Sequence, residues 1–169
     1  MREQTINTYD YHVWANKRVF ERLAELPEEV LHQELCNVFP TIYKGLVHIY
    51  QVDTVWLSGM MGNSYEQIVE LIGTIEAKTA GKSLKELQAV YWEKAEEYRI
   101  FLNRVDDLQA KKQFPHPTFG VLNASIQELI QHIVNHGTYH RGNISSMLRQ
   151  LGHAGASSDF VFYLYEVNK

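Results

Sequence analysis

Three histidines spaced four residues apart, His132, His136 and His140, form the clearest chemical pattern in this sequence. Side chains four positions apart on an α-helix lie on one face, one turn above another, so neighbouring imidazoles can converge on a single ion. Imidazole is largely uncharged near neutral pH, and its free ring nitrogen is a common ligand for transition metals. The spacing therefore predicts a metal site on a helix that contains these residues.

The register of that helix favours two of the three histidines. An α-helix turns about 100° per residue, so with His136 at 0° the apolar residues of the segment fall between about 20° and 80°. His140 lies at about 40°, within the apolar face, whereas His132 lies at about −40°, outside it. We therefore expect His136 and His140 to point into the core. Gly137 costs about 1 kcal/mol relative to Ala within a helix, which indicates close packing beside this site.

A site with two imidazoles is incomplete, and a third ligand should come from a facing helix. His48 stands in the middle of a mostly apolar segment, and His12 lies on the inward face of the first segment. A buried ring without a partner costs about 1–3 kcal/mol, and either a metal or a hydrogen bond would satisfy it. The residues alone rank His48 first and His12 second.

Long segments with helical periodicity must position these histidines. Proline and glycine separate them, and Ser83 with Glu86 and Ser125 with Glu128 have the form of capping boxes. We predict an all-α protein, a four-helix bundle in one domain over residues 1–169. The expected long helices cover residues 5–26, 41–61, 83–105 and 125–151, with a short extra helix over 65–78.

Two segments do not fit this helical pattern. Residues 112–122 combine prolines, aromatic residues and a glycine, which favours a loop with some extended structure. The aromatic C-terminal tail, residues 159–167, is predicted to be irregular or extended, with packing on the core as the default interpretation. Trp14 falls opposite the inward face of its helix, which indicates a second packing surface or a dimer contact.

Charge and composition argue against several classes of protein. The chain carries 16 Lys+Arg against 20 Asp+Glu, a net charge of -4, so the basic excess of a nucleic-acid-binding protein is missing. No run of about 18 apolar residues indicates a membrane span. The single Cys36 forms no internal disulfide and fits a reducing compartment. With a polar N-terminus that lacks the form of a signal peptide, these features favour a cytoplasmic protein.

The same residues carry a family resemblance that spans the chain. The segment NHGTYHRGN, residues 135–143, resembles the last-helix signature of the DinB/YfiT superfamily of bacterial metal-binding bundles. WANKR at 14–18 and the stretch 47–57 are similar to its first and second helices. The resemblance implies a four-helix bundle, often a homodimer, with a three-histidine metal site. Carried over by position, the ligands are His48, His136 and His140, which favours His48 over His12.

Three neutral imidazoles without a carboxylate favour a divalent ion, with Zn ranked first, Ni second, and Fe and Mn behind them. Three protein ligands leave a position open to water or substrate. The resemblance implies a metal-dependent thiol S-transferase of the bacillithiol type, or a hydrolase, with a small-molecule thiol or electrophile as partner. The alternatives are a non-catalytic metal-binding stress-response protein and a helical interaction module without metal. No general acid or base is identified; Tyr139, Arg141, Asn143 and Asp53 are candidates by proximity.

Overall fold

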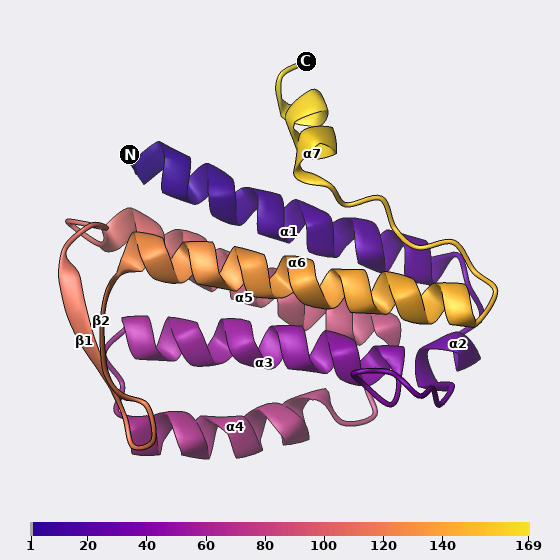
Figure 1. Cartoon of the computed structure of the whole chain (residues 1–169), viewed down its shortest axis with the longest axis horizontal. Coiled ribbons are helices and arrows are strands. Elements are labelled where there is room, and N and C mark those ends of the chain that lie inside the picture. Colours follow the sequence, from indigo (N-terminus) through magenta and orange to yellow (C-terminus); the bar gives the residue numbers. More distant parts are fainter. Residues whose placement is uncertain (1) are drawn as a thin grey trace.

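A computed structural model describes residues 2–169, which form seven helices and one two-stranded sheet (Figure 1). Helix α6 packs against α1 and α3, and α5 packs against the same two helices, so the four long helices form a bundle. The predicted all-α four-helix bundle is confirmed. The long helices are α1 (Arg2–Ala24), α3 (Ile42–Met60), α5 (Leu84–Arg104) and α6 (Ile126–Gln150), and the shorter ones are α2 (Glu29–His32), α4 (Tyr65–Thr79) and α7 (Phe160–Val167).

Side-chain caps fix where several helices begin. The two predicted capping boxes are present: Ser83 and Ser125 each accept a hydrogen bond from the N3 backbone N–H, and the N3 glutamate accepts one from the cap backbone N–H. Ser64 makes a third box at α4, and Thr41 caps α3 by accepting from the backbone of Lys44. Each cap satisfies backbone donors that the helix itself leaves unpaired, worth about 0.5–2 kcal/mol.

Buried tyrosines join the helices across the core. The Tyr98 hydroxyl on α5 donates to the backbone oxygen of Asp53 on α3 at 2.6 Å, and Tyr91 donates to that of Leu46 at 2.5 Å. A buried phenol requires such a partner, and each bond ties α5 to a fixed turn of α3. Helix α3 also packs against α6.

Residues 112–122 lie in a β-hairpin, as the extended part of the prediction anticipated. Strands β1 (Lys111–His116) and β2 (Gly120–Ser125) are antiparallel, with Lys111 opposite Ser125 and His116 opposite Gly120. Gly120 has a φ of +80°, a conformation that favours glycine and allows the tight reversal. The hairpin leads directly into α6, whose first residue follows the capping serine.

The prediction of an irregular or extended C-terminal tail was wrong, because residues 160–167 form helix α7. An extended tail would need a strand edge to pair with, whereas a helical turn places Phe160 and Tyr163 against Tyr11 of α1. Tyr163 is buried, contacts Trp14, and donates to Asn7. Trp14 therefore lies at a second packing surface, as one of the two interpretations held.

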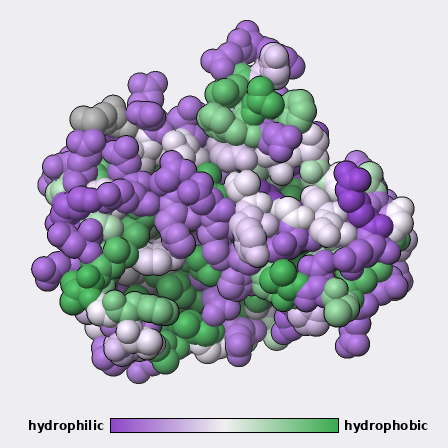
Figure 2. Space-filling view, in the orientation of Figure 1, coloured by the Kyte–Doolittle hydropathy of each residue, from purple (hydrophilic) through white to green (hydrophobic). Residues whose placement is uncertain are grey.

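Most of α7 nevertheless stays exposed, and only Tyr163 and the half-buried Leu164 pack against the core. Figure 2 shows its apolar side chains on the surface where α7 stands above the bundle.

Among residues 2–169, none of the helices combines the length and the apolar character needed to cross a membrane.

Candidate metal centre

Close approach of α3 and α6 creates the site. A Cβ at Gly45 would lie 3.1 Å from the Phe39 ring and 3.3 Å from Ile144, so the absence of a side chain lets the two helices approach at this level. His48 lies three residues after Gly45 on α3, and His140 lies four residues before Ile144 on α6. The contact therefore brings the histidine-bearing turns of both helices face to face.

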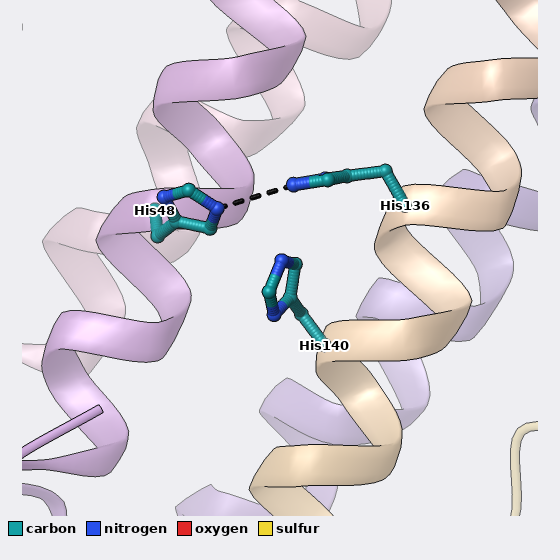
Figure 3. A group of neighbouring side chains, drawn as sticks. All are labelled: His48, His136 and His140. Atoms are coloured by element: carbon teal, nitrogen blue, oxygen red, sulfur yellow. Dashed lines mark hydrogen bonds between the residues drawn. The ribbon is translucent and has the colours of Figure 1, made fainter. Parts of the chain in front are cut away.

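His48, His136 and His140 come together between these helices (Figure 3). Each ring offers one nitrogen, and the three nitrogens lie within 4.8 Å of one another. The ring centroids are 5.0 Å apart for His48 and His136, 4.6 Å for His48 and His140, and 4.3 Å for His136 and His140. His140 is buried at 7% exposure and the other two are half-buried, which agrees with the register argument for α6.

One pair of nitrogens already has the spacing of two ligands on one ion. The Nε2 atoms of His48 and His136 are 3.1 Å apart and share a hydrogen bond. Two nitrogens bound at about 2.0–2.1 Å, with an angle at the metal between about 90° and 110°, lie about 2.8–3.4 Å apart. An ion could therefore replace the shared proton with little movement of these two rings.

The surroundings keep the imidazoles neutral, which metal binding requires. Burial, followed by the proximity of His140 and His48, lowers the pKa of His136 to about 3. Burial and the proximity of His48 lower the pKa of His140 to about 4, and burial lowers the pKa of His48. At neutral pH, all three rings are therefore uncharged imidazoles, and each keeps one nitrogen lone pair that can bind a metal.

Aromatic side chains enclose part of the cluster. The Phe39 ring, from the segment between α2 and α3, lies 5.2 Å from the ring of His48 and 5.0 Å from that of His140. Tyr139, 63% exposed, also contacts His140, with the two ring centroids 4.9 Å apart. The Nδ1 atom of His136 is buried and has no hydrogen-bond partner within residues 2–169, so protein groups satisfy this ring only through Nε2.

Comparisons with known proteins show the family and the fold of this chain. The model of the DinB family matches residues 1–168. The chain belongs to the DinB family. It is 38% identical over 165 residues to Protein DinB of Bacillus subtilis (strain 168), covering 98% of this chain and 96% of that protein. A crystal structure of an uncharacterized protein from Clostridium difficile 630 shares the fold, with a TM-score of 0.62 at 16% identity over 88% of this chain and 95% of that one.

In this DinB-family chain, the donor set fits a transition metal. Three neutral imidazoles from two helices form a group compatible with metal binding, and no carboxylate belongs to it. His132 lies outside the group: it is exposed, and its ring packs on Trp56 at 5.1 Å and stands 6.1 Å from that of His136.

His12, the second candidate for the third ligand, lies outside the group and instead belongs to a buried polar network. Its Nε2 is 2.9 Å from Oδ2 of Asp53, and its Nδ1 is 3.2 Å from Nη1 of Arg141. A guanidinium only donates, so Nδ1 accepts and the Nε2 hydrogen is directed to Asp53. Arg141 also donates to Asn16 Oδ1 and Thr138 Oγ1, each at 2.9 Å.

This network was missed from the sequence, although two signals for it were present. His12 and Asn16 are polar residues four apart on an otherwise apolar face, and Gly137 within α6 indicates close packing at that level. Of the proposed acid or base candidates, Asp53 and Arg141 belong to the network, while Asn143 lies 3.3 Å from His140 Nδ1. Tyr139 is the candidate that combines exposure with contact to the histidine group.

Proposed function

We propose that His48, His136 and His140 bind one divalent metal ion, and that the protein uses it to transfer a low-molecular-weight thiol to an electrophile. One observation carries the proposal: three imidazoles from two helices, with low pKa values, offer nitrogens within 4.8 Å of one another. The family membership and the whole-chain similarity to Protein DinB of Bacillus subtilis support it.

Zn is the ion we propose first and Ni the second, since imidazole suits both and the group contains no carboxylate. Three protein ligands leave a further position open, which is typical of catalytic rather than structural sites. A bound ion would supply a lowered pKa for a thiol held at that position, so that sulfur is available as thiolate near neutral pH.

The proposed reaction joins sulfur to carbon. The thiol releases its proton to solvent, the sulfur lone pair forms a bond to the electrophilic carbon, and a halide leaves with the electrons of the broken carbon–halogen bond. Phe39 and Tyr139, which flank the histidines, offer apolar ring surface beside the reacting atoms. The products are a thioether, a halide ion and a proton.

Metal binding is tested first, without reference to activity. Protein stripped with chelator is titrated with Zn²⁺ or Ni²⁺ and followed by calorimetry, with His136→Ala and His132→Ala compared. We expect one ion per chain for the wild type, loss of that binding in His136→Ala, and retention in His132→Ala, since His132 lies outside the group. Equal binding by both variants would contradict the assignment of the ligands.

Thiol transfer is tested second, on metal-loaded protein. A panel of low-molecular-weight thiols is incubated with a chlorinated aromatic electrophile, and thioether formation is measured for the wild type and the same two variants. A metal-dependent rate that His136→Ala abolishes and His132→Ala retains would support the transferase. Tight metal binding without turnover across the panel would contradict the catalytic part and favour a non-catalytic metal-binding protein.

A further inference from the structure

Helix α1 supplies no side chain to the histidine group, yet it contacts α6 directly beside it. Gly137, the residue after His136, is buried against the His12 ring. A Cβ at position 137 would lie 2.3 Å from Cε1 and 2.6 Å from Nδ1 of His12, and 2.8 Å from Nη1 of Arg141. These distances are far below ordinary van der Waals contact, so no larger residue fits without displacement.

The His12 ring is not free to yield to such a displacement. It is 0% exposed, with Nε2 bonded to Asp53 on α3 and Nδ1 to Arg141 on α6. Arg141 is itself 2% exposed and is held by Asn16 of α1. The ring is therefore attached to three helices at once, and its position is set by the bundle rather than by its own rotamer preference.

We infer that His12, Asp53 and Arg141 act as positioning residues for the metal centre. The His12 ring packs against α6 at Gly137. The inference rests on the proposed metal binding. Asp53 lies on α3, five residues after His48, and Arg141 follows His140 directly. The network therefore joins the two ligand-bearing helices through the His12 ring and fixes His136 and His140 relative to His48.

A matched pair of glycine substitutions separates this role from general stability. Gly137→Ala pushes α6 away from the His12 ring, whereas Gly142→Ala, on the same helix, meets no atom within 4 Å. At either position, alanine has a higher intrinsic helix propensity than glycine, by up to about 1 kcal/mol. Only the first displaces the histidine-bearing turn.

The test uses Co²⁺ as a spectroscopic probe, with each full-length protein held well below its own melting temperature. We expect Gly137→Ala to weaken Co²⁺ binding about 10–100-fold, the range for partners that orient ligands, and to shift the visible d–d bands. Gly142→Ala should match the wild type in both. Asp53→Asn, which keeps the side-chain size, serves as the second variant should Gly137→Ala fail to fold, with at least about a 10-fold weakening expected.

The outcomes separate the inference from the proposal beneath it. Wild-type protein that binds no Co²⁺ would overturn both. Wild-type binding together with unchanged affinity and spectra in Gly137→Ala and Asp53→Asn would overturn the positioning role alone, even if both variants melt at lower temperature. A spectral shift in either variant, absent from Gly142→Ala, would support it, because a purely structural role changes stability and not the coordination geometry.

Discussion

Removal of the Arg141 guanidinium should destabilise the metal-free protein more than a change at almost any other charged position. Arg141→Met keeps the length and much of the volume of the side chain but deletes its hydrogen bonds to His12, Asn16 and Thr138. It also removes the only charged nitrogen bonded to the His12 ring in the described network, which links Arg141 to Asp53.

The expected loss of stability in Arg141→Met follows from the burial of the two charged groups. Arg141 and Asp53 are 2% and 3% exposed, so the carboxylate that remains in Arg141→Met is a buried charge without a compensating cation. Leaving a buried charge without its compensating partner costs about 3–5 kcal/mol, and we expect the same range here, where the two groups are joined through the His12 ring and not by a direct ion pair. For a domain of this size, each kcal/mol lowers the melting temperature by about 2–4 °C, so a decrease of about 6–20 °C is expected.

Urea denaturation in chelator, followed by circular dichroism, measures this loss apart from any effect of metal. Arg149→Met, at an exposed position of the same helix, should change the free energy of unfolding by no more than about 1 kcal/mol. Adding Asp53→Asn to Arg141→Met should recover part of the stability, because the uncompensated charge disappears. Coupling between the two substitutions should reach about 1–3 kcal/mol.

Two results would refute this reasoning. A decrease of less than about 1 kcal/mol in the free energy of unfolding of Arg141→Met would mean that the guanidinium does not stabilise the buried charge of Asp53. Additive effects of Arg141→Met and Asp53→Asn, within about 0.5 kcal/mol, would mean that the two groups do not interact through His12.

Three further outcomes are expected. The pKa values of about 3 at His136 and about 4 at His140 lie below the unfolded value of about 6.5. The metal-free protein should therefore lose stability as pH falls from about 6.5 toward 4, by up to about 1.4 kcal/mol per pH unit for each ring. Urea midpoints measured across this pH range test the expectation, and a flat profile would contradict those pKa values. Tyr163→Ala should abolish hydrogen-exchange protection across α7, whereas Tyr165→Ala, 68% exposed, should leave it intact. Ser125→Ala should cost about 0.5–2 kcal/mol in thermal unfolding, since it removes the capping box of α6; an unchanged melting temperature would contradict that.

Local rules were sufficient for the parts of the molecule that depend on one helix at a time. The periodicity of apolar residues and the serine–glutamate pairs located α5 and α6, and the 100° turn separated the inward His140 from the exposed His132. The burial of these side chains depends on the face of α6 alone, so a single sequence contains the necessary information.

Features that depend on residues far apart in the chain could not be predicted from local sequence patterns. His12 bonds to Asp53, 41 residues away, and to Arg141, 129 residues away, and no local pattern specifies such pairs. The residues alone ranked His48 before His12, and the assignment of His48 as the third member of the group rested more on the family resemblance than on this ranking. Helix α7 was missed for a related reason, because its fold depends on the contact of Tyr163 with α1.

The contact between Gly137 and the His12 ring also has an evolutionary consequence. A mutation that adds a side chain at position 137 meets a ring 2.3 Å away, so it can persist only if position 12 changes to a smaller residue. The two positions should therefore covary among homologous chains, with glycine at 137 retained wherever an imidazole occupies position 12. A lineage that lost this glycine would be expected to have rebuilt the polar interior between its first and last bundle helices.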